Sequence, residues 1–161
     1  MGISDDDLGH LRRCVELARE ALDDGDAPFG SVLVDADGVV RFEDRNRTKD
    51  GDETRHPEFE IARWAAANMA PVQRVRATVY TSGEHCPMCA AAHGWVGLGR
   101  IVYAASTEQM VAWQMEWGSP PSPVSALPIT AVAPRVPVDG PARELESEMK
   151  ALYEARFGPN A

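Results

Sequence analysis

Two short motifs each place a potential metal ligand directly before a proline: His56-Pro57-Glu58 and, thirty positions later, Cys86-Pro87-Met88-Cys89. Proline is favoured at the first position of a helix, so His56 and Cys86 are each expected at a helix start. The positive end of a helix dipole stabilises a thiolate there. The motifs therefore predict two helix starts that face one place, with Cys86 and Cys89 on the first turn of the second helix.

The side chains of these motifs match the chemistry of a zinc site. One histidine and two cysteines supply three protein ligands and leave one tetrahedral position for water, which is the catalytic arrangement rather than the structural one. Glu58 follows His56 by two residues, so its carboxylate can lie beside the metal and move protons without binding the metal. The combination of H-x-E with C-x-x-C resembles the pattern of zinc deaminases, in which a proline precedes the first cysteine.

Helix and strand signals alternate along the rest of the chain. A stripe of apolar residues from Ser4 onward has helical spacing, and an Asp-Gly pair at 37–38 separates two strand-like runs. The expected order is a helix from Ser4, strands at 31–35 and 39–42, a loop at 45–54, a helix from Pro57 to before Pro71, a strand at 75–82, a helix after Pro87, a strand at 100–105, a helix at 108–117, a strand at 129–133 and a helix at 141–157. The strand, helix and strand within 75–105 predict a right-handed parallel crossover.

Length, charge and cysteine content limit the class of protein. A chain of 161 residues predicts a single domain, 1–161. Its 25 acidic and 16 basic residues give a net charge of −9, which argues against binding to a phosphate backbone. Three cysteines with one Cys-x-x-Cys pair fit a reducing compartment, and no apolar stretch is long enough for a membrane span. We expect a cytoplasmic protein.

The sequence resembles the cytidine deaminase-like superfamily, within it the guanine deaminase and tRNA adenosine deaminase branch. The matching segments are 27–34, Asn46, 56–58, 81–89 and 99–105. The resemblance implies a three-layer α/β/α fold with a mixed five-stranded sheet, usually built as a homodimer. It also implies Zn²⁺ as the cofactor, bound by His56, Cys86 and Cys89.

The same resemblance assigns roles around the metal. Glu58 is the implied proton shuttle, and Asn46 and Phe29 are the residues that hold the substrate ring. Pro57 stands where the family usually has alanine, whose N–H can donate to a substrate carbonyl, and proline has no N–H. Further candidates for substrate contact are Glu84, Trp113 and Glu116, although the tract around Trp113 also fits half of a core helix. His85 replaces the usual proline before the first cysteine.

These features predict zinc-dependent hydrolytic deamination of a free amino-substituted nucleobase. Guanine-like purines are the first expectation, and cytosine or triazine analogues come next. A tRNA adenosine deaminase is the main alternative. A Cys-Pro-x-Cys thiol redox protein is a second alternative, because a helix start can also activate the first thiol of such a pair. A closed structural zinc site that adds His93 and a further histidine to Cys86 and Cys89 is a third.

Overall fold

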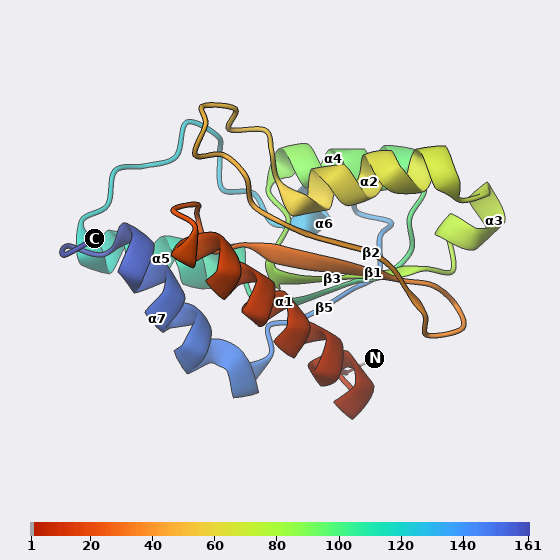
Figure 1. Ribbon diagram of the computed structural model, residues 1–161, viewed down its shortest axis with the longest axis horizontal. Helices are drawn as coiled ribbons and strands as arrows, with labels where there is room; N and C mark the ends of the chain where they lie inside the picture. Colours follow the sequence, from red (N-terminus) through yellow and green to blue (C-terminus); the bar gives the residue numbers. More distant parts are fainter. Residues whose placement is uncertain (1) are drawn as a thin grey trace.

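The computed structural model describes residues 2–161 and contains a five-stranded mixed sheet (Figure 1). The strands are β1 (Gly30–Val34), β2 (Val40–Arg45), β3 (Thr78–Gly83), β4 (Ile101–Ala105) and β5 (Val138–Asp139). They lie in the order β2-β1-β3-β4-β5. β1 pairs antiparallel with β2 and β3, whereas β3, β4 and β5 are parallel. The predicted mixed sheet and the parallel pairing across the 75–105 crossover are confirmed.

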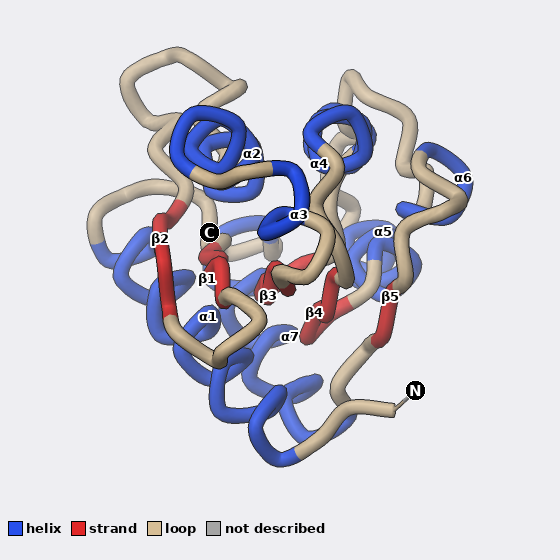
Figure 2. Tube along the Cα trace, turned by 90° about the vertical axis from the view of Figure 1, so that its right-hand side faces the viewer, coloured by secondary structure: helices blue, strands red, loops and turns tan. Residues whose placement is uncertain are grey.

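Helices cover both faces of this sheet, which gives the predicted three layers (Figure 2). One layer consists of α1 (Asp5–Asp23), α5 (Thr107–Trp117) and α7 (Glu146–Phe157), with the 3₁₀ turn η1 (Arg143–Leu145) before α7. The other consists of α2 (Pro57–Asn68), α3 (Pro71–Arg74), α4 (Pro87–Val96) and α6 (Ile129–Val132). None of the helices within 2–161 has the length and apolar character that crossing a membrane requires.

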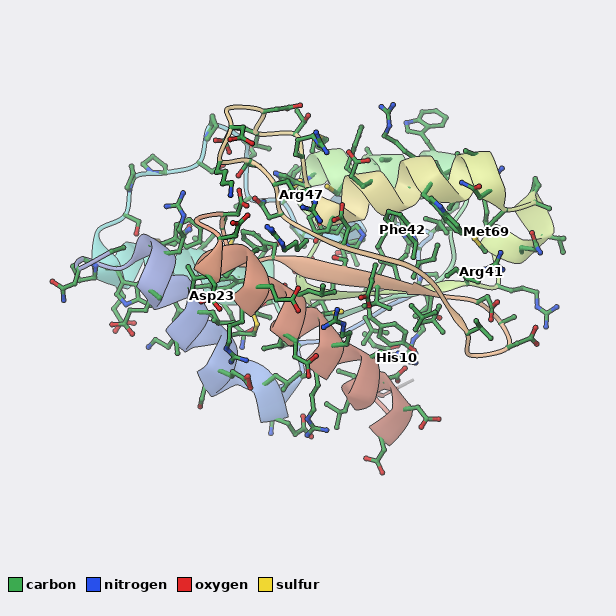
Figure 3. The ribbon with its side chains drawn as sticks, viewed as in Figure 1. His10, Asp23, Arg41, Phe42, Arg47 and Met69 are labelled. Atoms are coloured by element: carbon green, nitrogen blue, oxygen red, sulfur yellow. The ribbon has the colours of Figure 1, made fainter. Side chains whose placement is uncertain are left out.

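The buried strand β1 faces both layers because its side chains alternate. Val32 and Val34 pack in the cluster with α1 and α7, whereas Leu33 packs with α2. At the sheet edge, Phe42 on β2 lies below α2 and its ring stacks on Trp64 at 5.4 Å (Figure 3). The α2 side of the sheet therefore has an apolar cluster of its own, and the starts of α2 and α4 lie on this side.

Gly30 allows α1 to approach β1 closely, and we expect Gly30→Ala to destabilise the protein. A Cβ at position 30 would meet the Leu17 Cβ, lie 2.5 Å from the Cys14 carbonyl oxygen and lie 2.8 Å from the Ala18 nitrogen. Two of these atoms belong to the helix backbone, so the loss in unfolding free energy should reach about 3 kcal/mol. Urea denaturation measures it. Gly9→Ala, also on α1 but with no neighbour within 4 Å, is the control and should be neutral or stabilising by up to about 1 kcal/mol. Equal effects of the two substitutions would contradict this account.

A buried carboxylate, Asp7, joins α1 to the sheet. Its Oδ1 accepts from the Tyr80 hydroxyl at 2.8 Å and from Arg100 at 3.0 Å, and its Oδ2 accepts from the Ser4 N–H at 2.9 Å. Burial by itself raises the pKa of Asp7, but the Arg100 guanidinium, the Ser4 N–H and the Tyr80 hydroxyl outweigh it and lower the pKa to about 2. The carboxylate therefore stabilises the fold above about pH 4, and this contribution is lost as the pH falls towards 2.

We expect acid to destabilise the wild-type protein more steeply than the Asp7→Asn variant. Between pH 5 and pH 2 the unfolding free energy of the wild type should fall by about 2 kcal/mol more than that of the variant. Chemical denaturation at each pH measures both curves. Parallel curves would show that Asp7 does not carry this dependence.

The strand predicted at 129–133 is wrong, because Ile129–Val132 forms the short helix α6 and the fifth strand is the two-residue β5 at Val138–Asp139. Pro128 precedes the helix, and the Ile129 N–H donates to the Glu84 carboxylate at 2.8 Å. This tertiary contact stabilises the start of a helix in a segment whose β-branched residues favour a strand. The last helix also begins later than Pro141, since the Ala142 N–H donates to the carbonyl of Ala104 in β4.

Candidate active site

His56 and Cys86 stand at the starts of α2 and α4, as their prolines predict. Both are N-cap residues in extended conformation, and Pro57 and Pro87 occupy the first helical positions. Neither side chain makes a cap hydrogen bond to its own helix. Both side chains are therefore available to a shared ligand between the helix starts.

The His56 ring meets both cysteines of the second motif. Its Nδ1 lies 3.6 Å from the Cys86 Sγ and 3.5 Å from the Cys89 Sγ, and the three ligand atoms all lie within 4.8 Å of one another. Around a tetrahedral zinc, with bonds of about 2.3 Å to sulfur and about 2.0 Å to nitrogen, the nitrogen and each sulfur are about 3.5 Å apart. The spacing of these side chains therefore fits one zinc ion with a fourth position open.

The two thiols share charge unequally. The hydrogen bond from Cys89, together with His56, lowers the pKa of Cys86 to about 4 although burial opposes it. The same hydrogen bond, burial and the nearby Glu58 carboxylate raise the pKa of Cys89. Burial lowers the pKa of His56, but contact with Cys86 and the charge of Glu58 outweigh this effect and raise it. Cys86 is therefore the thiol of the pair that ionises more readily.

Glu58 lies beside this group with its side chain buried, 6% exposed. Its Oε1 accepts hydrogen bonds from the Ser31 hydroxyl at 2.9 Å and the Thr81 hydroxyl at 2.8 Å. Burial raises the pKa of Glu58, and the two hydroxyls and the His56 ring oppose that rise. A buried carboxylate beside a potential metal site is suited to proton transfer.

Comparison with known proteins identifies the family. Residues 4–105 match the model for the cytidine and deoxycytidylate deaminase zinc-binding region. The chain belongs to this deaminase family. Its zinc-binding character matches the His56, Cys86 and Cys89 group, which could hold the metal. The family also argues against the thiol redox alternative for the Cys-Pro-x-Cys motif.

Relatives within the deaminase family have different names. The chain is 31% identical over 147 residues to a probable cytosine deaminase of Schizosaccharomyces pombe, covering 90% of each chain. It is 35% identical over 96 residues to the guanine deaminase of Bacillus subtilis, covering 59% of this chain and 62% of the relative. These relatives support a hydrolytic deaminase and leave its base open.

Solved structures agree on the fold. One from a study of A-to-I editing by tRNA:A34 deaminases superposes with a TM-score of 0.63 at 26% identity, covering 90% of this chain and 99% of that one. The guanine deaminase of Nitrosomonas europaea superposes with a TM-score of 0.67 at 19% identity, covering 96% of this chain and 86% of that one. The cytidine deaminase-like fold is thus confirmed.

Two of the predicted substrate-binding residues, Phe29 before β1 and Asn46 after β2, contact each other. The Asn46 N–H donates to the Phe29 carbonyl at 2.9 Å, and the Asn46 Oδ1 accepts from the Thr48 hydroxyl at 2.8 Å. The Asn46 Nδ2 donates to none of the residues from 2 to 161. The Phe29 ring lies 5.6 Å from the ring of Tyr153 on α7. Asn46 therefore retains a donor for a ligand.

Glu84 connects three segments of the chain. One oxygen accepts the Thr107 N–H at 2.9 Å, at the start of α5, and the other accepts the Ile129 N–H at 2.8 Å, at the start of α6. Both oxygens are thus engaged by backbone donors. We interpret Glu84 as a residue that positions the loop before Cys86, and its contact with substrate stays a prediction.

The tract on α5 is divided between core and surface. Trp113 is buried and packs 6.0 Å from the Tyr153 ring, which favours the core-helix interpretation. Glu116 is exposed, with its carboxylate 3.5 Å from the Lys150 ammonium. The structure does not bring Trp113 or Glu116 into contact with the metal group, and their substrate roles stay predictions.

The closed structural zinc site is not formed. The His93 Nε2 lies 2.7 Å from the Gly99 carbonyl oxygen, and within 2–161 His93 is not a member of the group around His56. His85, beside Cys86, is buried with neither ring nitrogen hydrogen-bonded, and its ring meets that of His93 edge-on at 5.5 Å. Burial keeps the pKa of His85 well below its ordinary value, so the ring is neutral.

The site residues that sequence reasoning missed are Ser31 and Thr81. Ser31 is a small hydroxyl residue inside the otherwise apolar buried strand β1, and Thr81 is one of several hydroxyl residues in β3, where it is fully buried. The contrast in polarity in β1 is the signal that could have identified Ser31, since a buried hydroxyl needs a partner. The partner of both residues, Glu58, became evident only from the packing of α2 on the sheet.

Proposed function

We propose that this protein is a zinc-dependent hydrolytic deaminase of a free amino-substituted nucleobase. A guanine-like purine is the first candidate substrate, and cytosine or a triazine analogue is the next. The observation that carries the proposal is the buried Glu58 carboxylate beside the His56, Cys86 and Cys89 group. The names of the guanine and probable cytosine deaminase relatives support a free base as substrate.

In this mechanism His56, Cys86 and Cys89 hold the zinc. When bound, zinc supplies a Lewis acid that can lower the pKa of a bound water from 15.7 to about 7. Glu58 would take one proton from the attacking water and give it to a ring nitrogen, and would then take the second proton from the added hydroxyl and give it to the departing amine. The ring carbon gains the water oxygen as the carbon–nitrogen bond breaks, so the products are a ring carbonyl and ammonia.

Asn46 and Phe29 are proposed to orient the base. The Asn46 Nδ2 can donate to a carbonyl or ring nitrogen, and the Phe29 ring offers an apolar face for a planar heterocycle. Pro57 lies at the first position of α2 and has no N–H, so Asn46 takes on more of the polar recognition than in relatives with alanine there.

The charges beside the site favour a small substrate over tRNA. Four basic residues lie between the end of β2 and the start of α2, and each pairs with a carboxylate. The pairs are Arg45–Asp26, Arg47–Asp44, Lys49–Asp24 and Arg55–Glu60. Arg47 stands near the start of α2 (Figure 3), where its N–H donates to the Arg55 carbonyl. Phosphate binding would have to break these pairs, and the net charge of −9 opposes it as well.

A tRNA adenosine deaminase is the second candidate. It is supported by the 26% identity to the structure from the study of tRNA:A34 deaminases, which covers 90% of this chain. The two candidates differ in what surrounds the reacting base. A tRNA adenosine deaminase must bind the phosphate backbone around the base, whereas a free-base deaminase binds the base alone.

Ammonia release from a substrate panel tests the proposal. The zinc-loaded protein is incubated with guanine, adenine, cytosine, triazine analogues, the corresponding nucleosides and a tRNA anticodon stem-loop, with chelator-treated protein as the control. Zinc-dependent release from one free base is the expected result. Release from the stem-loop alone would establish the tRNA candidate, and release from none of the panel would contradict both.

Three broader expectations accompany this proposal. Residues 1–161 act as one deaminase domain in the cytoplasm, which the three free cysteines favour. The protein forms a homodimer, as the resemblance implies. Sedimentation velocity should give twice the 17.5 kDa chain mass. The mass of a single chain at micromolar concentration would contradict the predicted homodimer.

A further inference from the structure

We propose that Ser31 and Thr81 are positioning residues that fix one oxygen of Glu58 to the sheet and leave the other to carry the proton. This inference rests on the proposed function, in which Glu58 moves protons. It assigns different tasks to the two oxygens of one carboxylate: Oε1 is the anchored atom, and Oε2 is the atom that exchanges protons with water and substrate.

The two hydroxyls come from residues that are paired on the neighbouring strands β1 and β3. Ser31 on β1 and Thr81 on β3 are directly paired across the antiparallel ladder, and both are fully buried. The Ser31 Oγ lies 2.9 Å and the Thr81 Oγ1 2.8 Å from the same Glu58 oxygen. The two hydroxyl oxygens are 2.9 Å apart. The sheet therefore presents a pair of donors to Oε1 from below α2.

The other oxygen of Glu58 has a different environment. Within residues 2–161, no N–H or O–H group donates to the Glu58 Oε2, and a further side-chain hydrogen-bond partner of the Glu58 carboxylate is the thiol of Cys89, one of the three candidate zinc ligands. The terminal torsion of a glutamate is broad and roughly two-fold, so an unrestrained carboxylate exchanges its oxygens by rotation. Two donors on Oε1 oppose that rotation. Because Oε1 remains an acceptor whether Glu58 is ionised or protonated on Oε2, the restraint persists through the proton transfers.

Either hydroxyl can donate to the Glu58 Oε1 when the other hydroxyl donates to a different acceptor. Ser31 and Thr81 offer two hydroxyl hydrogens, and the acceptors within reach are the Glu58 Oε1, the Thr81 Oγ1 and the Gly83 carbonyl oxygen at 2.9 Å. If Thr81 donates to Gly83, Ser31 still donates to Glu58. If Ser31 donates to Thr81, Thr81 still donates to Glu58. The two residues are thus partly redundant, and their removal should be non-additive.

Steady-state kinetics of Ser31→Ala, Thr81→Val and the double variant test the proposal with the substrate that the panel identifies. Each single substitution should lower kcat about fivefold, and the double substitution about 100-fold, more than the product of the two. KM should stay within about twofold of the wild-type value, because ground-state binding does not use these hydroxyls. Zinc content should stay unchanged, and crystal structures of the double variant should show a rotated Glu58 carboxylate.

Two further variants separate positioning from general packing. Thr81→Ser keeps the hydroxyl and should restore most of the kcat that Thr81→Val loses. Ser82→Ala removes a neighbouring buried hydroxyl that accepts the Gly30 N–H at 3.1 Å, and it should leave kcat within twofold. If the double variant does not fold, the comparison of Thr81→Ser with Thr81→Val decides, and equal kcat values for that pair overturn the proposal.

The remaining outcomes are also decisive. A folded double variant with wild-type kcat, or with an unmoved Glu58 carboxylate, overturns the positioning role. A loss of kcat in Ser82→Ala as large as in the double variant does the same. Glu58→Gln in the same assay distinguishes a failure of the positioning role from a failure of the proposed function. If that variant is inactive while the double variant is fully active, only the positioning role fails; if Glu58→Gln is active, the proposed function fails.

Discussion

Glu58→Gln is expected to abolish deamination while the protein keeps its zinc. The amide cannot accept a proton from water or return one to the substrate. We therefore expect kcat to fall by about 10²-fold to 10⁴-fold. The side chain keeps its size and can still accept from the Ser31 and Thr81 hydroxyls through its carbonyl oxygen. The fold and the metal group should therefore survive, and ammonia release together with zinc content measures both effects.

Glu60→Gln is the matched control for that experiment. Glu60 lies two residues further along α2 and its carboxylate pairs with Arg55 at 3.5 Å, outside the metal group. Its kcat should stay within twofold of the wild-type value. Substantial turnover in Glu58→Gln, or an equal loss in both variants, would remove Glu58 from the proton-transfer role.

Cys86→Ser is expected to remove the metal, the activity and part of the stability together. With one of the three ligands replaced, zinc should fall from one per chain to a small fraction after dialysis, and deamination should fall to background. Zinc at about a thousand times its dissociation constant stabilises a folded site by about 4 kcal/mol. The variant should lose that contribution, because the metal ties the start of α2 to the start of α4. Elemental analysis and calorimetry measure the two losses.

Cys14→Ala controls for the loss of a thiol. Cys14 is buried under β1 on the α1 side, outside the group of three ligands, so this variant should keep a full equivalent of zinc. Its stability should fall only by the cost of a small cavity, about 1 kcal/mol. If Cys86→Ser also retained a full equivalent, the metal would be held by other residues.

The sequence predicted correctly those features that depend on residues close together in the chain. The prolines after His56 and Cys86 set both helix starts, and the Asp37-Gly38 pair set the turn between β1 and β2. The metal group followed from these positions, because two helix starts at one edge of a sheet bring their N-cap side chains together. These local signals therefore gave both helix starts and the three candidate ligands, whereas the mixed five-stranded sheet was expected from the family resemblance.

Features that depend on distant partners were not accessible in this way. The segment at 129–133 has strand propensity, yet the carboxylate of Glu84, 45 positions earlier, accepts the N–H of Ile129. The pairing of Ser31 with Thr81 depends on the register of two strands fifty residues apart. The charge compensation around Arg47 likewise requires the folded loop, since composition alone shows a basic cluster diluted by acids.

Glu84 holds the starts of α5 and α6, and the segment that connects these two helices is free to vary in sequence. Its carboxylate accepts the first N–H groups of α5 and α6 and lies two residues before Cys86. The exposed segment 120–128 runs between these helices, and near its beginning the Ser119 hydroxyl donates to the Phe157 carbonyl. In evolutionary terms, the segment can gain, lose or exchange residues while its two ends stay attached. Variation between relatives should concentrate there, and the ligand geometry a few residues away should stay constant.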